Sequence, residues 1–307
     1  MKNRRTRVLA AALLTLALTG CGSAASSDGM SGMHHGSGGH AHATASGAAG
    51  TGDTTGHDMP GHDAGGHDAA AGDGLAAEQG GYRLDLAAAE LPGGSPAELR
   101  FTVAGPDGAR LTAFQPEQTK PMHFYAIRSD LTGFQHLHPA MAADGTWTAP
   151  LTALRPGSWR VYASFVPDAG PGKGAGLVLS RPVTVPGTAA DTPLPAAAAT
   201  TTVDGYTLTV AGTPTAGTAT ELKVTVSKDG RPVTDLQPYL DTFAHLTAFH
   251  AGDQAFAHLH PQAARSAAGG PELTFHAELP KPGDWRLHLQ FQTGGTLHTA
   301  ALTLRAV

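Results

Sequence analysis

The sequence predicts an all-β protein: two tandem antiparallel β-sandwiches, preceded by a signal peptide and a disordered tail rich in His, Met and Gly. Short alternating apolar runs, separated by Pro, Gly and Asp, fill the chain after residue 81, as in antiparallel sheets. This pattern occurs twice in the same order, which indicates a tandem repeat. The 3 Trp, 5 Tyr and 10 Phe residues all follow residue 81. Only this part of the chain therefore has the side chains to form a core.

Residues 1–20 have the pattern of an export signal. A basic cluster precedes the apolar run Val8–Leu18, which is too short to be a permanent transmembrane helix. The run ends in Leu18-Thr19-Gly20-Cys21, which resembles a bacterial lipobox. The resemblance implies that Cys21 is diacylated and becomes the first residue of the mature protein, and two acyl chains give stable anchoring. We expect a lipid-anchored protein on the extracytoplasmic face of the cell membrane.

The composition excludes several classes of protein. A single Cys rules out an internal disulfide, a zinc ribbon and an iron–sulfur site, so a metal site would use His, Met or carboxylates. A net charge of −5 with 20 Lys+Arg argues against a nucleic-acid partner. The sequence has no nucleophile elbow, phosphate loop or His-Glu-x-x-His motif, so we expect no enzyme.

Residues 21–80 form the predicted tail. It contains no Lys or Arg, and Gly, Ala, Ser and Thr fill the spaces between its ligand-type residues, as in a flexible tether. Imidazole suits Cu(II), Zn and Ni, whereas the Met thioether selects Cu(I). We expect the tail to bind metal weakly at several points; the alternative is a solvated linker. The candidate ligands of the tail are Met30, Met33, His34, His35, His40, His42, His57, Met59, His62 and His67.

Two β-rich copies follow, at residues 81–187 and 201–307, joined by a linker at 188–200. Their strands and turns predict antiparallel sandwiches of immunoglobulin-like type. The corresponding segments include Gly81-Tyr82 and Gly205-Tyr206, His136-Leu137-His138-Pro139 and His258-Leu259-His260-Pro261, and Pro156-Gly157-Ser158-Trp159 and Pro282-Gly283-Asp284-Trp285.

Each copy contains a predicted hairpin that bears three histidines. In the second copy, a turn at residues 251–254 places His245 opposite His260 and position 247 opposite His258. Because side chains alternate along a strand, His245, His258 and His260 share one face.

The first copy has the same spacing between its histidines. The same register places His123 opposite His138 and Tyr125 opposite His136, so His123, His136 and His138 also share a face. A three-residue bulged loop within residues 130–133 would shift this register and separate the histidines.

Three imidazoles at these separations can converge on one ion, so we hypothesise a tri-histidine metal site in each copy. The alternative is that the histidines are buried packing residues. Met122 and Met141 lie near the first trio, and His298 is a further possible ligand in the second copy. From ligand softness we expect Cu(I) in the first copy and Cu(II) in the second.

Each copy resembles the exported sandwiches of the CopC and YtkA-like type, through its His-x-His hairpin and its Pro-Gly-x-Trp strand. The resemblance implies an immunoglobulin-like fold, an extracytoplasmic location and copper handling without catalysis. The chain departs from CopC in having Cys21, not His, at the mature N-terminus. Only His298 corresponds to the late His of that pattern, and the first copy has none there.

The sequence thus predicts a membrane-anchored, metal-binding lipoprotein that sequesters or delivers a metal ion. Copper is the expected metal, with zinc and nickel as alternatives. The expected partners are the membrane, metal ions and an exported copper protein or transporter. A surface module that binds another protein, with structural histidines, is the alternative. A mononuclear metal enzyme with three His ligands and an open position is less favoured.

Overall fold

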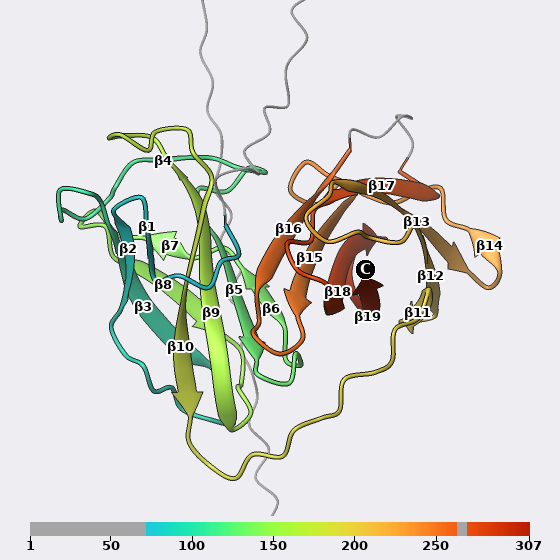
Figure 1. Ribbon diagram of the computed structural model, residues 1–307, viewed down its shortest axis with the longest axis horizontal. Helices are drawn as coiled ribbons and strands as arrows, with labels where there is room; N and C mark the ends of the chain where they lie inside the picture. Colours follow the sequence, from blue (N-terminus) through green and yellow to red (C-terminus); the bar gives the residue numbers. More distant parts are fainter. Residues whose placement is uncertain (1–71, 263–268) are drawn as a thin grey trace, which may run out of the picture. The chain divides into compact units, whose positions relative to one another are not determined.

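A computed structural model describes residues 72–262 and 269–307. The predicted signal peptide, Cys21 and the candidate ligands of the tail lie outside the described residues. Every regular element in the described part is a β-strand, and every pairing between named strands is antiparallel (Figure 1). The predicted fold class, tandem antiparallel β-sandwiches of immunoglobulin-like type, is confirmed.

The first sandwich has two separate sheets. One has the order β1-β2-β3-β8-β7, and the other has the order β10-β9-β5-β6, with β4 paired to β9. Between the sheets lies a core that includes Phe101, Phe124 and Trp147. The strands are β1 (Glu78–Gln79), β2 (Tyr82–Leu86), β3 (Ala97–Ala104), β4 (Phe114–Gln115), β5 (His123–Arg128), β6 (Gln135–Leu137), β7 (Ala140–Met141), β8 (Trp147–Leu151), β9 (Gly157–Pro167) and β10 (Leu177–Val185).

The second sandwich repeats this topology in one continuous sheet, β11-β12-β13-β17-β16-β15-β18-β19, with β14 paired to β13. The layers are joined because β16 pairs with β15 at Leu259 and with β17 at His260. The strands are β11 (Thr200–Val203), β12 (Tyr206–Ala211), β13 (Thr220–Lys228), β14 (Arg231–Pro232), β15 (Ala244–His250), β16 (Phe256–Pro261), β17 (Glu272–Ala277), β18 (Gly283–Thr293) and β19 (Thr296–Ala306).

Both hairpins have the register that equal histidine spacing predicts. Tyr125 pairs with His136 across β5 and β6. In the second sandwich, Thr247 pairs with His258 across β15 and β16. The register shift expected from a bulged loop is therefore wrong, although the turn does contain such a loop: Arg128 N–H donates to the Thr132 carbonyl, and Leu131 has a φ of +58°. The β15–β16 pairs end at Leu246 and Leu259, and His260 pairs with His276 of β17 on the other edge of β16, so the opposition of His245 and His260 stays a prediction.

The two central hairpin strands are buried on both faces. All six residues of β5 are buried, as are Ala244 to Phe249 of β15. One face of each strand packs on the core of its own sandwich. The other face enters a third apolar cluster to which both sandwiches contribute, so the two hairpin sheets pack against each other. This shared cluster consists of Tyr125, Ile127, Leu131, Tyr162, Val178, Phe249 and Phe256. The Tyr162 hydroxyl also donates a hydrogen bond to the Gln254 carbonyl, at 2.6 Å.

Ordered structure begins before Tyr82, within the segment assigned from sequence to the tail. Strand β1 pairs with β2, and Leu75 packs against the core of the second sandwich. Asp73 forms an ion pair with Lys281 at 3.1 Å. The sequence did not reveal this segment, because it lacks aromatic residues and is held by Leu75, an ion pair and backbone hydrogen bonds, including one from Phe256 N–H to the Asp73 carbonyl.

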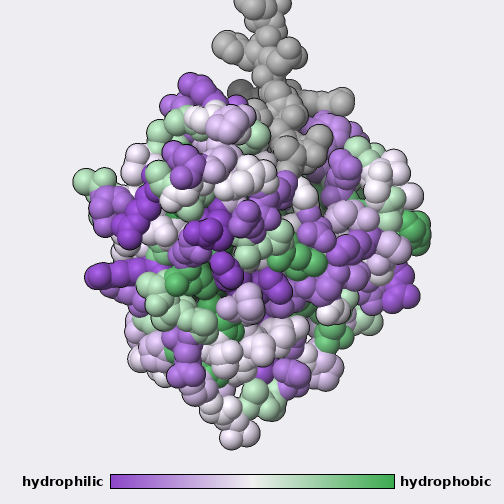
Figure 2. All heavy atoms as spheres, turned by 60° about the vertical axis from the view of Figure 1, so that its left-hand side comes forward, coloured by the Kyte–Doolittle hydropathy of each residue, from purple (hydrophilic) through white to green (hydrophobic). Residues whose placement is uncertain are grey.

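The described surface is mainly polar. Figure 2 shows hydrophilic residues interspersed with small hydrophobic areas on the face that it presents. Among the described residues, the exposed large hydrophobic side chains are Leu297 and Val307. Within this part of the chain there is no helix with the length and apolarity needed to cross a membrane.

Candidate metal centre

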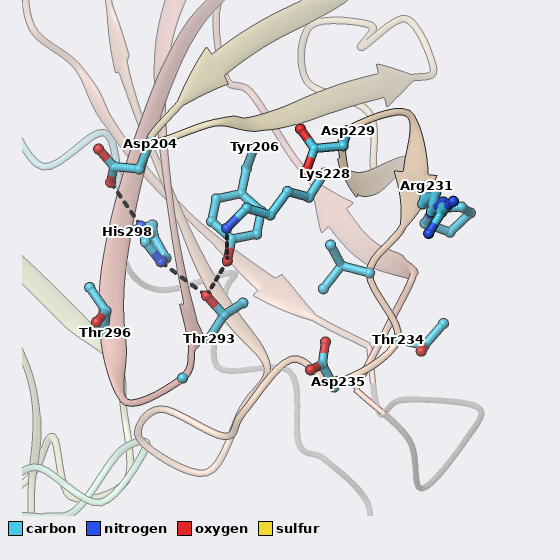
Figure 3. Close-up of a pocket in the computed structure, with 13 residues that line it drawn as sticks. Asp204, Tyr206, Lys228, Asp229, Arg231, Thr234, Asp235, Thr293, Thr296 and His298 are labelled. Atoms are coloured by element: carbon cyan, nitrogen blue, oxygen red, sulfur yellow. Dashed lines mark hydrogen bonds and ion pairs between the residues drawn. The ribbon is translucent and has the colours of Figure 1, made fainter.

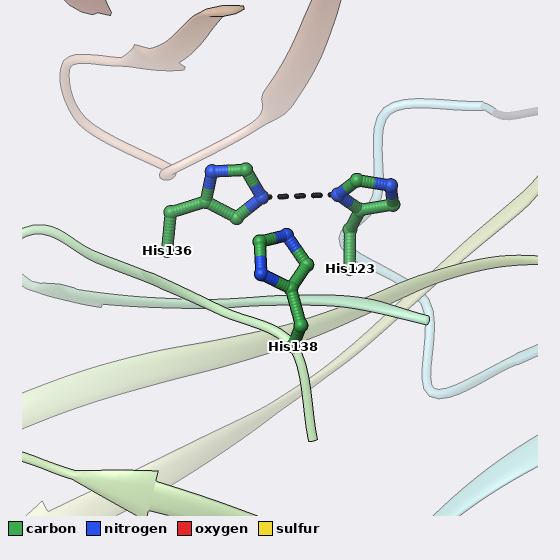
Figure 4. A group of neighbouring side chains, drawn as sticks. All are labelled: His123, His136 and His138. Carbon is green, nitrogen blue, oxygen red and sulfur yellow. Dashed lines mark hydrogen bonds between the residues drawn. The ribbon is translucent and has the colours of Figure 1, made fainter. Parts of the chain in front are cut away.

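Three histidines of the first hairpin come together. His123 begins β5, His136 is in the middle of β6, and His138 directly follows β6. One ring nitrogen from each residue lies within 4.8 Å of the other two. The ring centroids are 5.3 Å apart for His123 and His136, 5.0 Å for His123 and His138, and 4.7 Å for His136 and His138. Figure 4 shows the three rings converging. We call this group the first trio.

In His123 and His136, the ring nitrogen that points away from the centre of the first trio (the outer nitrogen) has a hydrogen-bond partner. His123 Nε2–H donates to the Glu117 carbonyl at 2.9 Å. His136 Nδ1–H donates to Gln290 Oε1 at 2.7 Å, and the amide nitrogen of Gln290 donates to Thr299 Oγ1 at 3.4 Å. These tautomers are assigned from the hydrogen-bond partners. Histidines that bind metals are held in this way, by a second ring N–H donated to a carbonyl or similar acceptor.

With Gln290 Oε1 as the acceptor, the inner nitrogens of the same two residues both carry lone pairs, whereas the reverse orientation of the Gln290 amide lets His136 Nε2–H donate to His123 Nδ1. His123 Nδ1 and His136 Nε2 lie 3.0 Å apart (Figure 4). Two lone pairs at this distance repel each other unless a cation, either a proton or a metal ion, lies between them. The arrangement is suited to binding a positive ion.

Burial disfavours a proton as that cation. Desolvation, followed by the charge of His123, lowers the pKa of His136 well below its ordinary value. The same two causes lower the pKa of His138 to about 3. The His136 and His138 imidazoles are thus neutral near pH 7, the form that binds metals. His138 Nε2 is buried and has no hydrogen-bond partner among the described residues.

Two histidines of the second hairpin lie near the first trio. The His245 ring is 5.9 Å from that of His136, and the His258 ring is 6.1 Å from that of His123. His245 Nε2–H donates to the Tyr239 carbonyl at 2.8 Å, as His123 does to Glu117. The side chain of His260 lies outside the described residues, so a separate second trio stays a prediction.

The other proposed ligands lie elsewhere. Met122 belongs to the core of the first sandwich, and Met141 packs against the same core. Met122 directly precedes β5, and because neighbouring residues of an extended chain point to opposite sides, its side chain points into the core and away from His123. We expected the first sandwich to prefer Cu(I) because of these two thioethers. Neither thioether is part of the first trio, so that expectation has no support from the site.

His298 lies in a separate hydrogen-bonded network at a cavity of about 930 Å³ (Figure 3). Its Nδ1 contacts Asp204 Oδ2 at 2.8 Å, and its Nε2 contacts Thr293 Oγ1 at 3.0 Å. The Tyr206 hydroxyl lies 2.7 Å from the same Thr293 oxygen. Both ring nitrogens of His298 thus have protein partners, and His298 is not in the group of possible metal ligands found in the described residues.

Sequence reasoning missed Gln290 and the Glu117 carbonyl. Gln290 is 154 residues from His136, and no local pattern links the two. The Glu117 carbonyl is a backbone group, which a residue pattern does not show. The sequence did contain one indication of these backbone acceptors. Glu117 lies six residues before His123, and Tyr239 lies six residues before His245.

The family comparison matches both repeats. A family model described as "Domain of unknown function (DUF8832)" matches residues 77–171 and again residues 201–307. The chain belongs to this family. No curated protein matches the chain. The resemblance to CopC and YtkA-like proteins stays a prediction.

Several solved structures are similar in fold. The Escherichia coli adhesin FdeC is 17% identical, with 74% of this chain and 64% of that chain covered and a TM-score of 0.24. The Yersinia pseudotuberculosis adhesin InvE is 15% identical, with 73% and 58% covered and a TM-score of 0.22. The tandem Ig repeats of Dlar are 9% identical, with 74% and 97% covered and a TM-score of 0.20. The chain spans less than two thirds of the two adhesin structures.

Proposed function

We propose that the protein binds a divalent transition-metal ion at His123, His136 and His138. The observation that carries this proposal is the convergence of three ring nitrogens within 4.8 Å, two of them 3.0 Å apart on rings that Glu117 and Gln290 hold from the far side. With metal–nitrogen bonds of about 2.1 Å, two ligand nitrogens are about 3.0 Å apart at the right angle that Cu(II) prefers and about 3.4 Å apart at the tetrahedral angle of zinc. At most a small outward shift of the two rings therefore accommodates the ion.

We take copper(II) as the first candidate for this ion. Three imidazoles without a thioether or thiolate suit Cu(II), Zn(II) and Ni(II), and Cu(II) binds most tightly to a given set of such ligands. Zinc and nickel are the competing ions.

The proposed role is sequestration or delivery of the metal at the extracytoplasmic face of the membrane. The lipobox-like sequence at Cys21 and the His/Met tail support this part of the proposal. In this view the tail collects ions, the first trio holds one tightly, and an exported copper protein or transporter receives it. We propose binding, not catalysis.

The test is a Cu(II) titration of the whole chain in competition with a chelator, compared with His136→Ala/His138→Ala. We expect one ion in the wild type to resist the chelator, and this ion to be lost in the double variant while weak binding by the tail persists. His276→Ala is the matched control, because His276 is exposed and bonded to Gln262. Equal chelator-resistant binding in the wild type and the double variant would overturn the proposal.

A second candidate function is a surface module that binds another protein, with histidines as structural residues. Hydrogen bonding in this chain favours it, since His298 has a protein partner at each ring nitrogen. His250 Nδ1 contacts Asp253 Oδ1 at 2.7 Å, and His250 Nε2 contacts the Pro282 carbonyl at 3.1 Å. FdeC and InvE, named above, are adhesins. Under this candidate, His136→Ala/His138→Ala lowers the free energy of unfolding and leaves the metal stoichiometry unchanged.

A further inference from the structure

Three side chains of the second sandwich approach the first trio. Gln290 of β18 accepts the hydrogen bond from His136 at 2.7 Å. His245 of β15 and His258 of β16 have ring centroids 5.9 Å from His136 and 6.1 Å from His123, respectively. The surroundings of the trio therefore include residues of both repeats.

His245 is the structural counterpart of His123. His245 pairs with Gln290 on β18, as His123 pairs with Ser164 on β9. Its Nε2–H is donated to a backbone carbonyl six residues earlier, at 2.8 Å, as in His123. This tautomer leaves Nδ1 as the lone-pair nitrogen of His245, the same atom that His123 offers. His245 is 1% exposed, so this nitrogen is held away from bulk water.

The spacing of the rings is compatible with a fourth imidazole. Rings on one tetrahedral ion have centroids about 5 Å apart, given metal–nitrogen bonds of about 2.1 Å. The first trio has separations of 4.7–5.3 Å. The 5.9 Å between His136 and His245 exceeds that geometry by about 1 Å, and His245 is outside the group whose ring nitrogens lie within 4.8 Å of one another, so the fourth ligand requires the His245 side chain to rotate toward the trio.

We propose that His245 is the fourth ligand, so that one metal ion is held jointly by the two repeats. This inference rests on the proposed function at the first trio. A closed shell of four protein ligands is typical of a structural or storage site, whereas a catalytic site keeps an open position. The ion would then also link the two hairpin sheets, because its ligands come from β5, from β6 and the residue after it, and from β15.

The experiment counts the imidazoles bound to Cu(II) by electron paramagnetic resonance and X-ray absorption. It uses the full chain with the tail histidines changed to Ser, so that they do not contribute. We expect four imidazoles in this chain and three in the same chain with His245→Gln. The Cu(II) affinity should fall at least tenfold with that change, the lower bound for loss of even an indirect partner of a metal ligand.

His258→Gln is the matched control, since His258 is on the adjacent strand and at a similar ring distance from the trio. It should keep four imidazoles. Three imidazoles in the unsubstituted reference chain would overturn the proposal, and this result does not depend on how any variant folds. Loss of an imidazole in His258→Gln but not in His245→Gln would also overturn it. A reference chain that binds no Cu(II) tightly would refute the proposed function itself, a different outcome.

Discussion

At the scale of single residues, the candidate site depends on groups outside the trio. His123 and His136 present lone pairs to each other because Glu117 and Gln290 accept the protons on the far sides of their rings. The trio itself followed from strand alternation and hairpin register, which sequence reveals. The two acceptors could not be predicted in this way, because the Glu117 group is a backbone carbonyl and Gln290 is 154 residues from His136.

Removing the side-chain acceptor tests this dependence. Gln290→Leu keeps the side-chain size and removes the acceptor for His136 Nδ1–H. The Cu(II) affinity should fall by about 10- to 100-fold, since loss of such a partner frees the tautomer and the ring orientation. A chelator-competition titration measures this. Gln292→Leu, on the same strand, is the control, and equal affinities in both variants would contradict the assigned role of Gln290.

A second prediction at this scale concerns His288, which stacks on Phe134 with ring centroids 4.2 Å apart. Burial, followed by the charge of Arg286, lowers its pKa to about 3. Between pH 6.5 and 3 the unfolded chain therefore binds a proton that the folded His288 does not, so stability is lost as the pH falls. The contribution of His288 is about 1 kcal/mol per pH unit.

Urea denaturation between pH 7.5 and 4.5 measures this contribution. The free energy of unfolding of His288→Gln should fall less steeply with decreasing pH than that of the wild type. His276→Gln, at an exposed position, should keep the wild-type slope. Identical slopes for the wild type and His288→Gln would show that His288 is not held neutral by its surroundings.

At the scale of elements, the hairpins were predicted well and their surroundings less well. Equal histidine spacing predicted both registers. The pairing of His260 with β17, on the other edge of β16, was not predicted, because a two-strand hairpin does not include that strand. The proposed role for Met122 overlooked alternation, since this neighbour of His123 points into the core.

The turn between β5 and β6 has a specific requirement for glycine. Gly133 has a φ of +70°, and a Cβ there would lie 2.4 Å from Trp159 Cη2. Gly133→Ala should lower the free energy of unfolding by about 2–4 kcal/mol, from backbone strain and steric overlap together. Thermal or urea denaturation measures the loss.

Gly108→Ala is the matched control for this turn. Gly108 has a φ of +76°, and a Cβ there would have nothing within 4 Å. Gly108→Ala should therefore lower the free energy of unfolding only through backbone strain, by about 1 kcal/mol. Equal losses for Gly133→Ala and Gly108→Ala would mean that the Trp159 contact does not constrain the turn.

At the scale of the whole described molecule, the main feature that the sequence did not predict is the contact between repeats. Repetition predicted two sandwiches, but which face of each hairpin sheet is covered depends on non-local packing. The shared cluster covers those faces with aromatic residues of both repeats, and the trio lies along the same strands. This contact explains why His245 and Gln290, from the second repeat, lie beside a site in the first.

The shared cluster should therefore affect metal binding from a distance. Phe256 has ring contacts with both Tyr125 (5.1 Å) and Tyr162 (5.3 Å). Phe256→Ala should cost about 3–4 kcal/mol of unfolding free energy and also weaken Cu(II) binding. Phe275→Ala, in the core of the second sandwich, should cost a similar free energy and leave the affinity of the folded chain unchanged. Equal effects of the two changes on affinity would contradict a contact between repeats that supports the site.

The central claim is one tightly bound ion, held by the histidines of both hairpins. Native mass spectrometry of the full chain, with its tail histidines changed to Ser and loaded with Cu(II) in the presence of a competing chelator, tests it most directly. The account predicts one retained ion per chain. Two retained ions would indicate a separate site in each repeat, and none would show that the buried histidines only pack; either result contradicts the account.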